Sequence, residues 1–209
     1  MKRLILIHYG EIGLKKGNID YFVEKLIKAV RLKLREKLKK SFKIVRSLQR
    51  IMVSLDEDFD EKEVVEILAK ISGIKNFKFV YVGSIEVEKL GQQIWKNLPK
   101  YVLEPLTRPK TFKVQVKRSM TLSQKSFEVE RDIGAVLLEN GIEVKVKLDD
   151  PEFVVDVEFF NDNAYFSFNK YFGVGGLPPN SQSKLVSLIS AGFDSPVAAY
   201  RMMRRGARI

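Results

Sequence analysis

The chain opens with MKRLILIHYGEIGLKKGN (residues 1–18), the stretch that decides the N-terminal fold. Its first nine residues alternate two sets of mostly apolar side chains, which is typical of a strand covered on at least one face. Three glycines then indicate a turn. A helix pattern follows to about residue 40, with apolar residues at every fourth position, and two short strand patterns cover 42–47 and 50–55. The first 55 residues therefore predict a β-α-β-β unit.

Positive charge is concentrated in the same part of the chain. The protein has 209 residues and a formal net charge of +11, from 37 lysines and arginines against 26 aspartates and glutamates. Residues 1–50 hold 15 of those cations and 4 of the acidic residues, so they carry the whole excess. Such a region is typical of a protein that binds a polyanion, because each phosphate contact releases counterions. A solvated basic helix is the alternative interpretation.

The composition excludes several classes of site. There is no cysteine, which rules out disulfides, thiolate metal sites and cysteine nucleophiles. A single histidine, His8, does not suffice for a multi-histidine metal site or a Ser-His-Asp triad, and we predict no metal site built by the protein itself. No apolar run is long enough to span a bilayer and no signal peptide is recognisable, so we expect a cytoplasmic protein without a membrane partner.

The middle of the chain predicts a second domain of mixed helices and strands. An acidic segment, 56–63, marks a shift in composition. Helix patterns cover 61–71, 89–103 and 126–139, and strand patterns cover 75–85, 111–118, 143–148, 153–160 and 164–169. The residues GVGGLPPNSQS (173–183) indicate a linker. We therefore divide the chain into a first domain (1–58), a second domain (59–171), a linker (172–183) and the start of a third domain (184–209).

The clearest motif for chemistry is KLVSLISAGFDSPVAAY, residues 184–200. It predicts a strand at 184–189, a turn at 190–195 and a helix opened by Pro196. Such a turn directs several backbone N–H groups at one point, which favours the binding of a phosphate. The alternative is an ordinary capped helix after a buried strand. Because one strand and one helix cannot close a doubly wound sheet, we expect the chain to stop inside a third domain.

The turn SAGFDS (190–195) resembles the SGGxDS PP-loop of ATP pyrophosphatases, with Ala191 in place of the first glycine. Three further stretches resemble the tRNA 4-thiouridine synthetase family, also called tRNA sulfurtransferases. They are HYGEIGLKKGN (8–18), and TFKVQVKRS (111–119) with SFEVERDIGAVL (126–137) from the THUMP domain of that family. The flanks of the loop, GVGGLP and SPVAAYRMMRRG, are similar as well. These matches follow the order of the family and cover nearly the whole chain.

The resemblance implies an α+β protein with a ferredoxin-like N-terminal domain, an α/β THUMP domain, and the first β-loop-α of a doubly wound PP-loop ATPase domain. In this family the first two domains bind the acceptor end of tRNA. The third uses ATP with Mg²⁺ to adenylate uridine 8, and sulfur from a persulfide donor protein then replaces the oxygen to give 4-thiouridine. Some members also donate sulfur to the thiazole of thiamine. We expect this chain alone to bind tRNA without catalysis, and the pairing of two chains as a homodimer stays open.

The candidate nucleotide residues follow from the same resemblance. Leu188 and Ile189 would line the ATP site, and the loop residues Ser190, Ala191, Gly192, Asp194 and Ser195 would surround the pyrophosphate. Asp194 and Ser195 are the catalytic candidates, and the Asp194 carboxylate is also suited to Mg²⁺ on the nucleotide. The candidate RNA contacts are cations of both domains: Lys15, Lys16, Arg50, Lys113, Lys117, Arg118 and Lys125. Taken singly, each of these cations is equally well explained as a solvated side chain.

Two other functions remain open from the sequence. One is an RNA-binding module of another THUMP-containing modification enzyme, such as a methyltransferase or a deaminase. The 190–195 loop argues against it, because methyltransferases bind their cofactor through a different glycine-rich turn. The other is a PP-loop enzyme that acts on a small acid or amide, which would leave the positive charge of residues 1–50 without a purpose.

Overall fold

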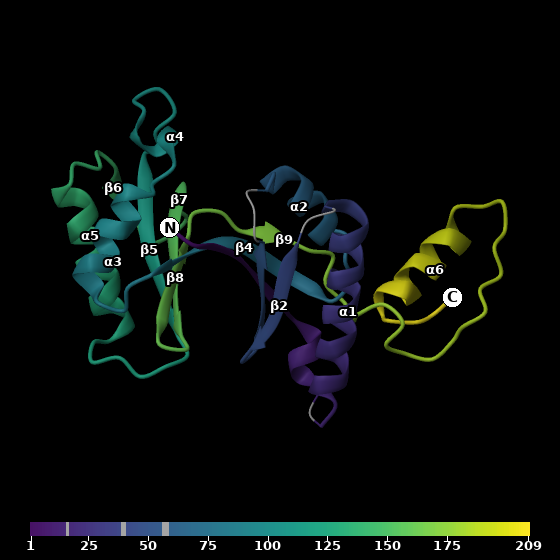
Figure 1. Ribbon diagram of the computed structural model, residues 1–209. Helices are drawn as coiled ribbons and strands as arrows, with labels where there is room; N and C mark the ends of the chain where they lie inside the picture. The colour runs from purple at the N-terminus through teal and green to yellow at the C-terminus, as the bar shows by residue number, and fades with distance from the viewer. Residues whose placement is uncertain (16, 39–40, 56–58) are drawn as a thin grey trace. The chain divides into compact units, whose positions relative to one another are not determined.

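The computed structural model describes residues 1–209 apart from 16, 39–40 and 56–58 (Figure 1). The described residues form two compact units. The terminal unit consists of Leu4–Lys78 and Lys170–Ile209, and the central unit consists of Met1–Arg3 and Phe79–Asn169. Residue 58, where the first domain was predicted to end, and the first three residues of the acidic segment lie outside the described residues.

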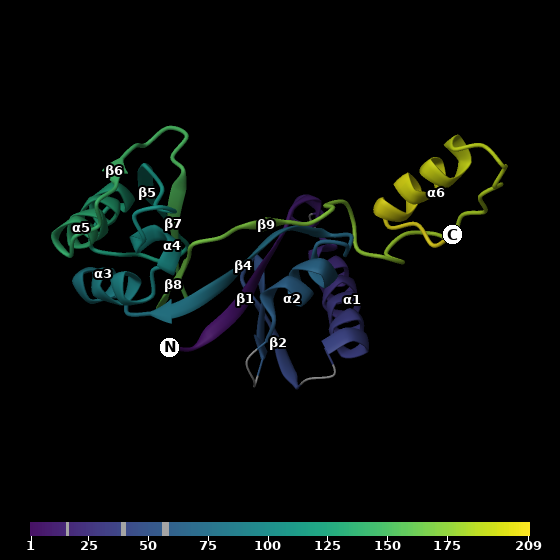
Figure 2. The ribbon, with the colours of Figure 1, turned by 90° about the horizontal axis from the view of Figure 1, so that it is seen from above.

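The terminal unit is built on neighbouring strands in the order β2-β3-β1-β4. They are β1 (Arg3–Tyr9), β2 (Phe42–Ser47), β3 (Arg50–Leu55) and the first half of β4 (Ile74–Gly83). Strand β3 runs antiparallel to both β1 and β2. Helices α1 (Ile19–Leu38) and α2 (Glu61–Leu68) pack together on one side of these strands (Figure 2). The order β-α-β-β-α-β is that of a ferredoxin-like fold.

Local sequence explains most elements of the terminal unit. The predicted helix 18–40 is confirmed as α1 over its described residues, and its buried stripe recurs every four positions as Phe22, Leu26, Val30, Leu34 and Leu38. The two short strands predicted at 42–47 and 50–55 are confirmed as β2 and β3, and they pair antiparallel with Ile44 opposite Val53. A short 3-10 helix, η1 (Glu11–Leu14), occupies part of the predicted glycine-rich turn. Helix α2 begins where the Asp60 carboxylate accepts a hydrogen bond from the Lys62 N–H (2.9 Å), an N-cap.

The central unit has the strand order β4-β8-β7-β5-β6. Its elements are the second half of β4, β5 (Thr111–Arg118), β6 (Lys145–Val146), β7 (Phe153–Phe160) and β8 (Asn163–Ser167), with helices α3 (Val87–Lys96) and α5 (Ser126–Glu139). Strand β5 is parallel to β6 and β7, whereas β8 is antiparallel to β7 and β4. The predictions for 111–118, 126–139 and 153–160 are confirmed at both ends.

The core of the central unit lies between one face of this sheet and the two helices. Because strand side chains alternate, Phe112, Val114 and Val116 of β5 are buried against residues of α3 and α5. Lys113 and Lys117, at the intervening positions, lie on the opposite face of the strand. The strand pattern therefore separates the core of this unit from its candidate RNA contacts.

Some predicted elements of the middle of the chain differ from the structure. The helix predicted at 89–103 is two helices, α3 and α4 (Lys100–Leu103). Pro99 lies between them, and proline both lacks an N–H and disfavours helical backbone in the residue before it. The strands predicted at 143–148 and 164–169 are shorter, as β6 and β8. Strand β9 (Tyr171–Phe172), which pairs with β4, is too short to leave a pattern in the sequence.

The strand predicted at 184–189 is wrong for this structure. Lys184 makes one parallel β-bridge to Arg208, and the residues from there to Ile189 form no strand. A strand needs a hydrogen-bonding neighbour along its whole length, and 207–209 provide one at a single position. The helix that follows is confirmed as α6 (Asp194–Arg204), with Pro196 in its first turn. In the part of the chain that the structure describes, no helix is long and apolar enough to cross a membrane.

Candidate functional site

The predicted phosphate loop, residues 190–195, lies between the extended segment 185–189 and α6. Its two serines face each other, with Ser190 Oγ and Ser195 Oγ 3.1 Å apart. The backbone N–H of Ser190 donates to Ser195 Oγ (2.9 Å), and that of Gly192 donates to Ser190 Oγ (3.4 Å). No side chain caps the first turn of α6. The loop therefore gathers hydroxyl and N–H groups at a helix N-terminus, the kind of site that binds a phosphate.

Small and acidic side chains leave this loop exposed to solvent. Ala191, Gly192 and Asp194 are exposed, and Asp194 lies in the first turn of α6 without a capping hydrogen bond. Among the described residues, no group of three or more His, Cys, Asp or Glu side chains could hold a metal ion alone. A divalent cation at Asp194 would therefore need phosphate oxygens as its other ligands. The loop is therefore open to a phosphate group.

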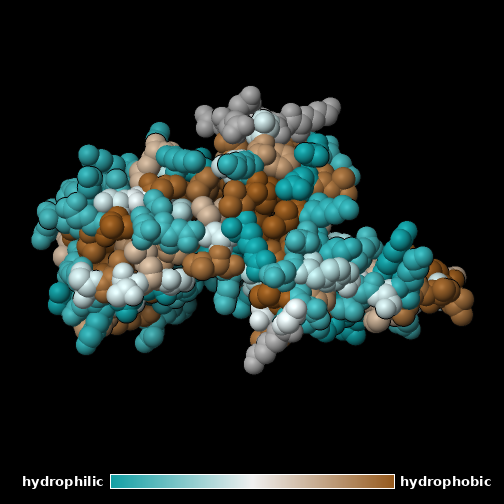
Figure 3. Space-filling view, turned by 60° about the horizontal axis from the view of Figure 1, so that its bottom comes forward, coloured by the Kyte–Doolittle hydropathy of each residue, from teal (hydrophilic) through white to brown (hydrophobic). Residues whose placement is uncertain are grey.

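The apolar side of the predicted ATP site is not enclosed. Leu188 and Ile189 are 88% and 62% exposed. Figure 3 shows hydrophobic residues (brown) gathered at the right-hand end of the molecule, where Figure 1 places the loop before α6. Among the described residues, Leu188 and Ile189 therefore form no enclosed apolar wall for the predicted nucleotide base.

The candidate RNA contacts of the central unit fall at the two ends of β5. Near the start of the strand, Lys113 Nζ donates to the carbonyl of Leu148 (3.2 Å). At the other end, Lys117 Nζ lies 4.0 Å from Asp156 Oδ2, and the Arg118 guanidinium donates to the carbonyl of Gln124 (2.7 Å). These contacts hold each cation in place at a surface where it can still meet a phosphate.

Arg118 and Lys125 are brought together by the loop that joins β5 to α5. Arg118 bonds to the residue next to Lys125. The backbone N–H of Lys125 donates to the Glu128 carboxylate (2.6 Å), which caps α5 and leaves the lysine side chain exposed. Two cations that are separated in the sequence therefore share one exposed loop.

The candidates of the terminal unit are less accessible. Arg50 is only 8% exposed, and it lies in β3 opposite His8 and Ser47. A phosphate contact by Arg50 would require this buried side chain to leave its position, so its environment disagrees with its predicted role. Lys15 Nζ lies 5.6 Å from the centre of the Phe22 ring, a cation–π contact. Lys16 lies outside the described residues.

Arg50 lies near other polar and charged side chains that interact with one another. Burial raises the pKa of the Tyr9 phenol above its ordinary value, and the neighbouring Arg46 and Arg50 guanidinium groups oppose that rise. Arg46 in turn forms an ion pair with Asp20 on α1 (2.5 Å). These groups bind one another, which is the pattern of a structural cluster rather than of a free phosphate contact.

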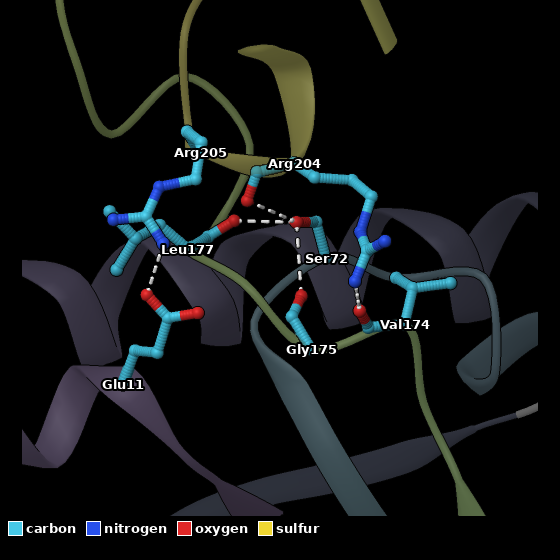
Figure 4. Close-up of polar contacts among 7 residues, drawn as sticks. All are labelled: Glu11, Ser72, Val174, Gly175, Leu177, Arg204 and Arg205. Atoms are coloured by element: carbon cyan, nitrogen blue, oxygen red, sulfur yellow. Dashed lines mark hydrogen bonds and ion pairs between the residues drawn. The ribbon is translucent and has the colours of Figure 1, made fainter. Parts of the chain in front are cut away.

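A second polar cluster of the terminal unit, which was not predicted from the sequence, is centred on Ser72 (Figure 4). It joins the turn before β4 to the segment after β9 and to the end of α6. The sequence feature that could have indicated this cluster is the glycine-rich stretch 173–176. It predicted a linker, but it did not show that the linker packs against other segments. A cavity of about 880 Å³ lies beside it between α1, α2 and α6, and lysines of α1 line it: Lys25, Lys28, Lys33 and Lys37.

Comparison with protein families finds three matches along the chain. The ThiI ferredoxin-like domain matches residues 4–77, the THUMP domain matches 87–169, and the family described as thiamine biosynthesis protein (ThiI) matches 180–209. These matches agree with the ferredoxin-like terminal unit, the central unit and the loop before α6. The fold and the loop together define a THUMP protein that carries a ThiI-type segment after its THUMP domain.

Comparison with individual proteins shows which enzymes the chain is similar to. Probable tRNA sulfurtransferases of Methanocaldococcus jannaschii and a Thermoanaerobacter species are 34% and 35% identical, over 99% and 100% of this chain and 54% and 52% of theirs. A solved 4-thiouridine synthetase, in complex with RNA and with bound ATP, is 29% identical with a TM-score of 0.76, over 99% of this chain and 51% of that one. A solved Pyrococcus horikoshii protein shares the fold, with a TM-score of 0.84 and 23% identity over 98% of this chain and 66% of that one. The chain therefore carries the ThiI ferredoxin-like, THUMP and ThiI family domains and is similar along its whole length to proteins named tRNA sulfurtransferase. It spans about half the length of the curated relatives it matches.

Proposed function

We propose that this chain is the tRNA-binding portion of an ATP-dependent tRNA sulfurtransferase that converts uridine 8 of tRNA to 4-thiouridine. The observation that carries the proposal is the order of its parts: a ferredoxin-like fold, a THUMP domain, and then an open phosphate loop at the N-terminus of α6. A 4-thiouridine synthetase solved with RNA and ATP aligns with the chain over 99% of its length. The chain alone binds the acceptor end of tRNA without catalysing the reaction.

The RNA side of the proposal rests on charge. Lys113, Lys117, Arg118 and Lys125 are held at exposed or half-exposed positions of the central unit, and Lys15 is half-exposed in the terminal unit. Such cations bind phosphates without reading bases. Recognition of an acceptor end therefore depends on RNA shape and on its single-stranded terminus.

The nucleotide side rests on the loop 190–195. ATP supplies the adenylate that makes a uridine oxygen a leaving group. The hydroxyl groups of Ser190 and Ser195, together with the N-terminus of α6, bind the phosphates, and Asp194 holds the accompanying Mg²⁺. A persulfide on a donor protein provides the sulfur, and the same sulfur transfer serves thiamine thiazole synthesis in some members. We place these reactions in the cytoplasm.

The RNA part of the proposal is tested by titrating this chain with whole tRNA, an acceptor-stem minihelix with a single-stranded 3′ end, and a blunt RNA duplex. The minihelix is expected to bind about tenfold more tightly than the blunt duplex, because the minihelix has an unpaired 3′ end and the blunt duplex has none. The logarithm of the affinity should fall with the logarithm of salt concentration, with a slope of roughly 0.7 to 0.9 per phosphate contact. Equal, weak binding of all three RNAs would contradict acceptor-end recognition.

The nucleotide part is tested in the full-length protein by the substitution Asp194→Asn. We expect ATP-dependent formation of 4-thiouridine to fall by about 100-fold or more, because the neutral amide no longer holds the cation that screens the phosphates. The affinity for tRNA should not change. The reaction is followed by chromatography of the nucleosides from digested tRNA.

Asp162→Asn is the matched control for that experiment. Asp162 is exposed in the turn between β7 and β8, at a positive φ of 53° that asparagine also accepts. It removes the same charge far along the chain from the loop. A similar fall in both variants, or none in Asp194→Asn, would remove Asp194 from the nucleotide site.

A further inference from the structure

Three segments of the terminal unit that are distant in the sequence meet at one place, which we call the joint: Ser72–Ile74, Gly173–Leu177 and Arg204–Gly206 (Figure 4). Ser72 Oγ lies at its centre, 2.7 Å from the carbonyl oxygen of Leu177, 3.2 Å from that of Arg204 and 3.3 Å from that of Gly175. A serine hydroxyl has one proton to donate, and the nearest acceptor is Leu177. The other two carbonyls crowd around the same oxygen.

Backbone and charged groups tie the same segments together. The N–H of Gly73 donates to the carbonyl of Gly175 (2.8 Å), and the N–H of Leu177 donates to the carbonyl of Arg204 (2.9 Å). The Arg204 guanidinium donates to the carbonyl of Val174, and Arg205 forms an ion pair with Glu11 of η1 (Figure 4). The last turn of α6 is thus bonded both to the segment after β9 and to the ferredoxin-like fold.

Glycine at position 176 permits the close approach of these segments. Gly176 has a φ of +78°, and a Cβ atom there would lie 2.2 Å from the carbonyl oxygen of Arg204. Gly175 also has a positive φ, +66°, but a Cβ atom there would have no neighbour within 4 Å. Both glycines therefore have a positive φ that other residues rarely adopt, but of the two only Gly176 also lacks room for a Cβ atom.

We infer that the joint positions the phosphate loop, with Ser72 as a positioning residue that acts through α6. The helix has 11 residues, so it extends roughly 16 Å from the joint to the loop. Holding its last turn against the ferredoxin-like fold sets where its first turn lies. If the loop binds ATP, as the proposed function requires, the joint keeps that nucleotide at a set distance from RNA held by the ferredoxin-like fold.

The inference is tested by measuring a distance across the joint, without any ligand. The chain has no cysteine, so Arg35→Cys on α1 and Ala198→Cys on α6, both at exposed positions, take two spin labels and no others. Double electron–electron resonance then gives the distribution of distances between the labels. We expect one narrow peak in the otherwise unchanged chain.

Two variants break the joint in different ways. Ser72→Ala removes the hydroxyl, and Gly176→Ala introduces the clash with Arg204. Both are expected to lose the narrow peak and to give a broad or displaced distribution. Ser72→Thr retains the hydroxyl and is expected to restore the narrow peak. Gly175→Ala is the control for backbone strain without a clash, and it should leave the peak unchanged.

The outcomes separate this inference from the proposed function. A broad distribution in the unchanged chain, or a narrow one in both Ser72→Ala and Gly176→Ala, overturns the positioning role of the joint. Broadening in Ser72→Thr as large as in Ser72→Ala overturns the assignment to the hydroxyl, and circular dichroism verifies that every variant is folded. Failure to bind tRNA in the titration would overturn the proposed function and leave these distances unaffected.

Discussion

Replacing Lys113, Lys117, Arg118 and Lys125 together with glutamine is expected to weaken binding of the acceptor-stem minihelix about 100-fold near physiological salt. Each cation that neutralises a phosphate releases counterions, so its loss removes a favourable entropy of release. The salt dependence provides the sharper readout, because the slope should fall by about 3 when four contacts are lost. Fluorescence anisotropy of a labelled minihelix at several salt concentrations measures both quantities.

A charge-matched variant shows whether position matters or only net charge. The same unit has four other exposed lysines that are not among the predicted RNA contacts: Lys89, Lys96, Lys100 and Lys145. Their replacement with glutamine removes an equal charge and is expected to change affinity by less than about threefold. Equal losses in the two variants would reduce the predicted contacts to a general attraction between a basic protein and RNA.

The substitution Phe166→Ala is expected to lower the free energy of unfolding of the central unit by about 3–5 kcal/mol. Phe166 is fully buried in the core of that unit, and its ring stacks on Tyr81 with a centroid distance of 5.2 Å. The same ring meets Phe168 edge to face at 5.8 Å. Truncation to alanine removes these contacts and leaves a cavity that the surrounding β8 and α3 residues fill only in part.

The protein contains a single tryptophan, Trp95, and it packs against the same core. Its fluorescence in a urea titration therefore reports on the central unit, whatever the stability of the terminal unit. Phe166→Leu keeps most of the volume and is expected to cost about 1 kcal/mol. A Trp95 transition that moves by less than about 0.5 kcal/mol in Phe166→Ala would show that this core does not depend on the aromatic cluster.

The elements that local pattern predicted well are those whose cause is local. The alternation of 111–118 and the fourfold spacing on α1 state which side chains face a core, whatever that core contains. The helix 126–139 was confirmed at both ends. At its C-terminal end, Asn140 and Gly141 end the helical pattern. The interruption at Pro99 was local as well, and the prediction of one continuous helix there gave it too little weight.

The candidate site likewise contains residues that local sequence identifies and residues whose environment only the fold determines. The loop 190–195 was recognisable because small residues and hydroxyls next to a helix start are written consecutively in the chain. Arg50 was not distinguishable from an exposed arginine, because it is buried in a sheet where it lies opposite His8, a residue remote in the sequence. For the same reason the sequence offered Lys113 and Lys125 as equals, and only the fold shows that Lys125 shares a loop with Arg118.

By itself the sequence determined the amphipathic elements and the turn at 190–195 before a helix, since each follows from neighbouring residues and their periodicity. Only the tertiary structure decided which of these segments have hydrogen-bonding and packing partners elsewhere in the chain. Residues 184–189 have the apolar composition of a strand but not the neighbouring strand that would bond to it. Conversely, the glycine run 173–176 has the composition of a flexible linker, yet Ser72 and Arg204 bond to it and Gly176 allows them to approach. Hydrogen-bond partners and steric clearance come from residues far away in the chain, so no local pattern contains them.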